Sequence, residues 1–184
     1  MRFRSLVVAA VASLALAGCG EKADYIRFAE TEGIYVDVGP LTYQVQLSRY
    51  MNPGDIEDRD YMRGLPLNTK LQAPPGEIWF GVFMRVKNYT DAVQSPTRDF
   101  VITDTEGNEY RPIPLDPVKN VFSYNPGSLG PSQVLPNPSS AAALGPIQGS
   151  LILFKLKNES LQNRPLVLHI EQEGQEPAEI DLDL

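Results

Sequence analysis

The chain has few of the residues that build chemical sites in proteins. Its 184 residues include one cysteine, one histidine and one tryptophan. A single cysteine excludes a disulfide within the chain, so the fold has to rest on its hydrophobic core. One histidine is too few for a blue-copper site, which needs two histidines and a thiolate. We therefore expect no cofactor and no catalytic centre, and we predict that the protein is not an enzyme.

Positive charge is also scarce. There are 16 Lys and Arg residues against 23 Asp and Glu residues, which gives a net charge of −7 at pH 7. Nucleic-acid binding requires basic side chains gathered on one face, so this class of partner is excluded. The same negative charge disfavours electrostatic docking on anionic lipid. The simplest consequence of the charge is that it keeps the protein soluble.

No apolar run is long enough to span a bilayer. The longest, Leu6 to Leu16, has about 11 residues and is interrupted by Ser13, whereas a membrane-spanning helix needs roughly 20. Arg2 and Arg4 precede it, and small residues follow it. This order is typical of a secretory signal.

The end of that signal, Leu16-Ala17-Gly18-Cys19, resembles the lipobox of bacterial lipoproteins. The resemblance implies a signal peptide of residues 1–18, cleavage before Cys19, and a diacylglycerol on its thiol. One acyl chain binds membranes only marginally, whereas two or more give stable anchoring. We therefore predict that the protein contacts the membrane through lipid on Cys19, at the extracytoplasmic face of the cell membrane. Gly20, in an organism with two membranes, would permit sorting to the outer one.

The mature chain divides into a short N-terminal segment and one domain. Residues 19–33 are polar with little periodicity, and we interpret them as an acylated flexible tether. Residues 34–184 suit a single domain with a sizeable core.

Most of residues 34–184 has the pattern of β-strands. Alternation of apolar and polar residues, or β-branched and aromatic enrichment, identifies them. The strands are expected at 34–38, 41–50, 77–87, 100–103, 109–111, 150–157, 166–171 and 180–184. In the first half of 77–87 both faces are apolar, which predicts a central strand. Tyr43, Val45 and Leu47 are expected on one face of 41–50.

Three segments between the strands have other signals. Asp104 and Gly107 suit a type I turn, which predicts a hairpin. Asp55 can cap a short helix through Tyr61 or Met62. Residues 111–146 hold eight of the chain's 16 prolines, which predicts a long crossing loop with one edge strand near 118–124.

Seven or eight short strands separated by turn signals predict an all-β, immunoglobulin-like antiparallel β-sandwich without a disulfide. The order of residues 82–88, 100–110 and 149–154 resembles the immunoglobulin-like domain of bacterial surface lipoproteins related to an immunoprotective extracellular antigen. Residues 43–61 resemble a block found in lipoproteins of high-GC Gram-positive bacteria. The resemblance covers roughly residues 34–184 and implies the fold and the location, but no functional residues.

The expected function is therefore interaction with an envelope protein or polymer. Tyr110, Phe122 and Tyr124 lie in or near the proline-rich loop, and we predict that they form an exposed aromatic binding surface.

The alternative is a cation- or small-ligand-handling lipoprotein. Asp55, Glu57, Asp58 and Asp60 could offer oxygen ligands to calcium, although the segment lacks the glycine and the final glutamate of an EF-hand loop. Met51 and Met62 with His169 are a remote copper(I) set. His169 lies opposite Leu166, Leu168 and Ile170 in its strand, so it is expected to face solvent or a second sheet.

Overall fold

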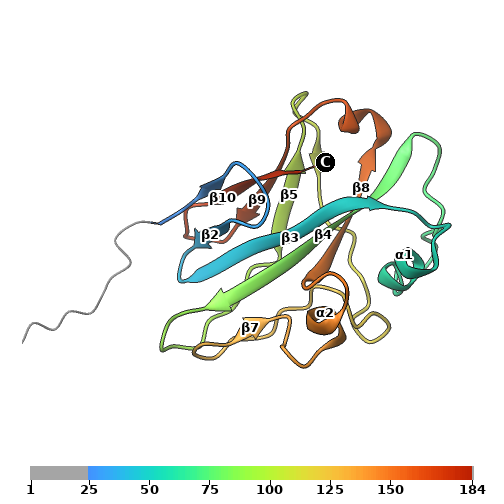
Figure 1. Ribbon diagram of the computed structural model, residues 1–184. Helices are drawn as coiled ribbons and strands as arrows, with labels where there is room; N and C mark the ends of the chain where they lie inside the picture. The colour runs from blue at the N-terminus through green and yellow to red at the C-terminus, as the bar shows by residue number, and fades with distance from the viewer. Residues whose placement is uncertain (1–24, 184) are drawn as a thin grey trace, which may run out of the picture.

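The computed structural model describes residues 25–183, which form two packed β-sheets with short helices at their margins (Figure 1). The predicted signal peptide and Cys19 lie outside the described residues. None of the helices in this range is long and apolar enough to cross a membrane.

The first sheet has the strand order β1-β10-β9-β5-β6. Its bounds are β1 Phe28–Ala29, β5 Asp99–Thr103, β6 Glu109–Tyr110, β9 Leu166–Glu171 and β10 Ala178–Leu182. All pairs are antiparallel except β1 with β10. The predicted hairpin is confirmed, because β5 and β6 pair across a turn that Gly107 N closes onto Asp104 O at 2.9 Å.

The second sheet has the order β2-β3-β4, and both β7 and β8 pair with the far edge of β4. Its bounds are β2 Tyr35–Val38, β3 Leu41–Met51, β4 Glu77–Asn88, β7 Val134–Leu135 and β8 Ser150–Lys157. β4 is central, as predicted: β3 pairs along one side and β8 along the other. The all-β antiparallel sandwich predicted from the sequence is thus confirmed.

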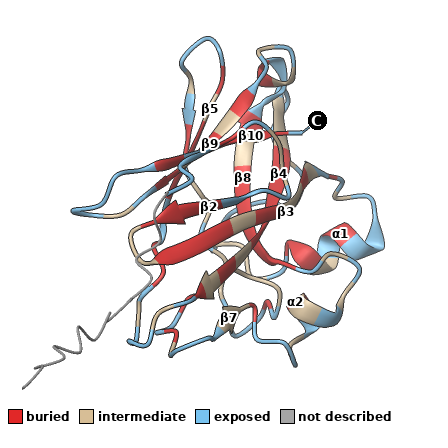
Figure 2. Cartoon of the chain, turned by 60° about the vertical axis from the view of Figure 1, so that its left-hand side comes forward, coloured by how far each residue is buried: buried red, intermediate tan, exposed pale blue. Residues whose placement is uncertain are grey.

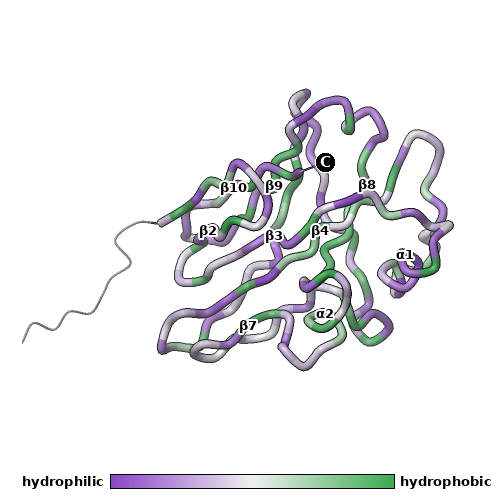
Figure 3. Tube along the Cα trace, in the orientation of Figure 1, coloured by the Kyte–Doolittle hydropathy of each residue, from purple (hydrophilic) through white to green (hydrophobic). Residues whose placement is uncertain are grey.

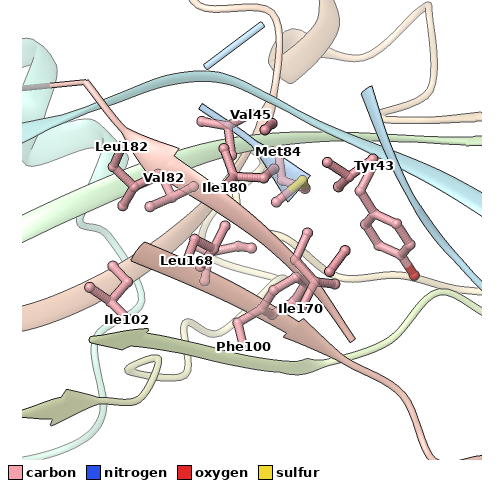
Figure 4. Packing of buried hydrophobic residues seen from close by; sticks show 14 of the residues in the cluster. Tyr43, Val45, Val82, Met84, Phe100, Ile102, Leu168, Ile170, Ile180 and Leu182 are labelled. Atoms are coloured by element: carbon pink, nitrogen blue, oxygen red, sulfur yellow. The ribbon is translucent and has the colours of Figure 1, made fainter. Parts of the chain in front are cut away.

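The main core lies between the two sheets. Alternate residues of β3 and β4 face inward onto alternate residues of β5, β9 and β10 (Figure 4). Examples are Tyr43, Met84, Phe100, Leu168 and Ile180, each at most 1% exposed. Burial of each such side chain contributes about 1.5–3 kcal/mol. Hydrophobic segments concentrate in the paired strands, and the loops are more hydrophilic (Figure 3).

A second core covers the outer face of β4. Trp79 and Phe83 of β4 pack there with Met51 of β3, and with Tyr61 and Met62 from the helix region α1, Ile56–Tyr61. The cap at Asp55 is as predicted, since its carboxylate accepts bonds from the backbone N of Glu57 and Asp58. Figure 2 shows the buried inner side of α1 and its exposed outer side.

One prediction about β3 was wrong. A β-bulge shifts the register between Val45 and Leu47, and an extra residue in one strand reverses which side chains face which way. Tyr43 and Val45 therefore face the other sheet, whereas Leu47 packs in the second core.

Two other expectations need correction. The segment 19–33 is not a free tether in its described part, because β1 pairs with β10 and Ala29 is buried in the main core. No strand forms at 118–124: Val118 and Val121 are exposed in turns, and only Ser123 makes an isolated bridge, to Leu151. The added edge strand is β7, and the short helices α2, Ala141–Leu144, and η1, Asn158–Leu161, were not predicted.

Candidate binding site

A groove of about 430 Å³ opens at the edge of the sandwich where the two sheets part. We call it the edge groove. Its floor is Phe100 of β5 and Leu151–Leu153 of β8, and its walls are residues 111–115 and Ser123–Tyr124. The lining is mostly apolar with a few polar groups, which is the usual composition of a ligand site.

Backbone hydrogen bonds hold the walls of the edge groove against β8. Ile113 N donates to Leu153 O, and Tyr124 N donates to Leu151 O, both at 2.7 Å. Leu151 N in return donates to Phe122 O at 2.7 Å. The proline-rich loop is therefore fixed to the sheet edge, and the groove exists before any ligand enters it.

Tyr124 is the aromatic side chain of the groove wall. Its ring meets that of Phe100 edge to face at 5.2 Å, and its hydroxyl donates to Thr97 O at 2.9 Å. Burial, together with the nearby Tyr43, raises the pKa of Tyr124 well above its usual value, against the opposing effect of Arg98. The hydroxyl therefore stays neutral and remains a hydrogen-bond donor at physiological pH.

The rim of the edge groove carries two cations and one anion. Arg111 Nη1 lies 3.2 Å from Asp99 Oδ1. Arg98 Nη2 donates to Asn125 Oδ1 at 3.1 Å and to Pro126 O at 2.8 Å. The rim is therefore locally positive in a chain of net charge −7, which favours a partner segment with an anionic group beside its apolar part.

The aromatic surface predicted from the sequence does not form. Tyr110 is buried, with its hydroxyl against Ser160 Oγ. Phe122 packs into the second core, where its ring meets that of Tyr61 at 4.8 Å. Of the three, Tyr124 lines the edge groove. The aromatic side chains in and near the loop turn inward because they pack against apolar residues at the edge of the sandwich.

Three exposed tyrosines lie elsewhere, around a hollow of about 800 Å³ that we call the tyrosine hollow. Tyr25, Tyr35 and Tyr89 line it and are 51%, 38% and 62% exposed. Tyr25 comes from the start of the described chain, Tyr35 from β2, and Tyr89 from the position directly after β4. Residues so distant in sequence meet only through strand pairing, so no local pattern could have identified the set.

Three of the four acidic residues proposed for calcium are already engaged. Asp55 caps α1. The buried Asp58 carboxylate accepts two hydrogen bonds from the Arg49 guanidinium and a third from Asn52 N at 2.6 Å. Asp60 pairs with Arg63 at 2.7 Å, and Glu57 is exposed. Within residues 25–183 no three His, Cys, Asp or Glu side chains are grouped so that they could hold a metal ion.

The proposed copper set was wrong. Met51 and Met62 are fully buried in the second core, on the outer side of the β2-β3-β4 sheet. His169 belongs to β9 in the other sheet. The two groups are therefore separated by the sandwich and do not share a site.

His169 lies on the outer face of its sheet between two partners that the sequence did not reveal. Its Nε2 is 2.9 Å from Thr103 Oγ1, and its Nδ1 is 3.3 Å from Glu179 Oε1. A hydroxyl, an imidazole and a carboxylate in this order have the connectivity of a nucleophile–base triad. All three sit on paired strands, outside both hollows described above.

Comparison with known proteins adds support for the fold. No protein-family model matches the chain, and no curated protein matches its sequence. The yjhA protein from Bacillus subtilis is structurally similar, with a TM-score of 0.52 and 9% identity, over 84% of this chain and 99% of that one. An uncharacterised β-sandwich protein from Clostridium difficile 630 aligns with a TM-score of 0.43 and 11% identity, over 89% of this chain and 99% of that one. The chain thus shares its overall fold with the yjhA protein.

Proposed function

We propose that this protein is a membrane-anchored extracytoplasmic lipoprotein whose immunoglobulin-like β-sandwich binds another envelope protein or polymer and carries out no catalysis. The edge groove is the proposed site of that interaction. The anchor is supported by the charged start, the short apolar run and Leu16-Ala17-Gly18-Cys19, where the chain's single cysteine stands at the position that the lipobox requires.

The observation that carries the binding role is the preformed edge groove. Its apolar floor and fixed walls suit an extended apolar segment of a partner, and Arg98 and Arg111 at the rim suit an acidic group on that segment. A rigid scaffold with an irregular loop along its edge is a common arrangement for recognition.

The anchor is tested by membrane fractionation of cells that express the full chain or its Cys19→Ser variant. We expect the full chain in the membrane fraction after a carbonate wash and the variant in the soluble extracytoplasmic fraction. A Cys19→Ser protein that stays with the washed membranes would contradict the anchor.

The groove is tested by photocrosslinking in the native envelope. A photoreactive amino acid at Pro114, an exposed residue of the groove wall, is compared with one at Val118, which is exposed on the same loop outside the groove. We expect a discrete adduct from position 114 alone. Equal adducts from both positions, or none from 114, would contradict this site.

A charge reversal at the rim sharpens that test. Arg111→Glu removes a rim cation, and Lys119→Glu makes the same charge change in a similarly exposed Asp-paired residue away from the groove. Since opposite charges at a rim promote association, Arg111→Glu should lower the adduct yield from position 114 and Lys119→Glu should not. Equal effects of the two changes would rule out a role for the rim.

A further inference from the structure

The tyrosine hollow lies at the end of the sandwich where the described chain begins. It is formed by Tyr25, the turn Gly39-Pro40 between β2 and β3, and Tyr89 just after β4. Figure 1 shows these segments at one end of β3 and α1 at the other. Two of the three tyrosines have a cation near the ring. The Arg27 guanidinium lies 5.3 Å from the ring centroid of Tyr25, and Lys87 Nζ lies 4.0 Å from that of Tyr89.

The chain is fixed to the domain directly after Tyr25. Ile26 N donates to the buried Asp37 Oδ2 at 3.0 Å, and Asp37 N donates to Ile26 O at 2.6 Å. Thr42 Oγ1 donates to the other carboxylate oxygen of Asp37 at 3.0 Å. Together with the pairing of β1 and β10, these bonds define where the path from the domain toward Cys19 starts.

The remaining path is short. Six residue steps separate Cys19 from Tyr25, and even a fully extended chain of that length spans only about 20 Å. With the lipid of Cys19 in the membrane, Tyr25 at the border of the tyrosine hollow has to lie within that distance of the anchor point. Tyrosines prefer the membrane–water boundary, because the ring is apolar and the hydroxyl remains hydrated.

We infer that the tyrosine hollow rests on the headgroup layer of the membrane that holds the lipid anchor, with Tyr25, Tyr35 and Tyr89 as the contacting side chains. This inference depends on the proposed lipid anchor. The contact does not require anionic lipid, so the net negative charge of the chain does not oppose it. Arg27 and Lys87 lie next to the phosphate groups. Two acidic residues also line the hollow: the Asp37 carboxylate accepts hydrogen bonds from Ile26 N and Thr42 Oγ1, and Asp91 is exposed.

The test uses the single cysteine. The chain from Cys19 onward is coupled through its thiol to a maleimide lipid in phosphatidylcholine vesicles, and tyrosine side chains are iodinated and located by mass spectrometry. Tyr50 is the internal control, because it is 46% exposed at the opposite end of β3. If the tyrosine hollow contacts the membrane for about nine-tenths of the time, iodination of Tyr25, Tyr35 and Tyr89 should be about tenfold slower than in solution. The iodination rate of Tyr50 should be unchanged.

A variant pair keeps the test specific. In Tyr35→Ser/Tyr89→Ser, Tyr25 on vesicles should again react as fast as in solution, whereas Tyr50→Ser should leave its protection intact. Equal reaction rates on vesicles and in solution for the unsubstituted protein would overturn the inference. Protection by a soluble chitooligosaccharide without vesicles, with none on vesicles, would also overturn it and assign the hollow to a glycan.

The chemical coupling separates this inference from the proposed anchor. The thiol is attached to lipid in vitro, whatever happens to Cys19 in the cell. If fractionation supports the anchor and the vesicle footprint is absent, only the membrane contact is wrong. If Cys19→Ser leaves fractionation unchanged, the proposed anchor is wrong independently of the footprint.

Discussion

The hydroxyls of Tyr110 and Ser160 lie 2.5 Å apart, and Ser160 Oγ donates to Asp104 Oδ2 at 2.7 Å. The Asp104 carboxylate also accepts Glu106 N at 3.1 Å and Asn108 N at 2.9 Å. The β5–β6 hairpin is thereby tied to η1, which follows β8. Burial acts to raise the pKa of Asp104, but the bonds from Ser160 and Asn108 outweigh it and lower the pKa to about 2.

We predict that Asp104→Asn destabilises the fold by about 1–3 kcal/mol, because a buried acceptor of several hydrogen bonds is replaced by an amide. The folded-state pKa of Asp104 lies below its ordinary value of 3.8. Its stabilising effect is therefore complete above pH 3.8 and is lost as the pH falls toward 2. Urea unfolding at a series of pH values measures both effects.

Glu106→Gln, in the exposed part of the same turn, is the matched control and should leave stability nearly unchanged. The assignment fails if Asp104→Asn loses stability between pH 3.8 and 2 as steeply as the unsubstituted protein does.

The positions of the main strands could be predicted from sequence because alternation and turn residues are local signals. The central place of β4 was equally visible, since both of its faces are apolar. The bulge at Gln46 was not, because its effect depends on pairing with β4. The bulge places Leu47, Arg49 and Met51 on the outer face. Leu47 and Met51 can therefore pack in the second core, and Arg49 can contact Asp58. The tyrosine hollow was missed for the same reason: three distant tyrosines meet only in the folded chain.

The pair formed by Arg49 and Asp58 ties the end of β3 to α1, and we predict that Asp58→Asn destabilises the fold by about 1–3 kcal/mol. Solvent reaches part of the Arg49 guanidinium, which keeps the cost below that of a fully buried pair. Asp60→Asn removes the exposed pair with Arg63 and should cost less than about 1 kcal/mol. Equal losses for the two variants in urea unfolding would contradict the docking role of Asp58.

Gly149 has no room for a side chain. A Cβ there would lie 2.8 Å from the backbone C of Phe83 and 3.1 Å from Met84 N. Because backbone atoms cannot move aside easily, Gly149→Ala should cost about 1–3 kcal/mol. Gly127→Ala is the control, since a Cβ at Gly127 meets nothing within 4 Å. Thermal unfolding of both variants tests this, and a neutral Gly149→Ala would contradict the packing at the start of β8.

Calcium should not stabilise the protein through the acidic segment around α1. Asp55, Asp58 and Asp60 are already used by the helix cap and by Arg49 and Arg63. A site filled at one hundred times its dissociation constant would add about 2.7 kcal/mol, which thermal unfolding detects easily. We expect the same unfolding temperature with calcium and with a chelator. A clear rise in the unfolding temperature with calcium, abolished by Asp55→Asn, would instead support a cation site in this segment.

Thr103, His169 and Glu179 provide the connectivity of a catalytic triad but not its surroundings. Acyl transfer also needs hydrogen-bond donors that stabilise the oxyanion, commonly backbone N–H groups. The strands that carry these three residues are paired with one another in the sheet, and that pairing uses their backbone N–H groups. We therefore predict that hydrolysis of p-nitrophenyl acetate is the same for the unsubstituted protein, Thr103→Val and His169→Ala.

The stability of these variants provides the complementary measurement. A cross-strand pair on an outer sheet face contributes roughly 0.2–1 kcal/mol, so each substitution should cost no more than that in urea unfolding. If Thr103→Val instead removed a measurable acyl-enzyme burst while the fold stayed intact, the outer face of the β1-β10-β9-β5-β6 sheet would hold an active site. The proposed non-catalytic role would then be wrong.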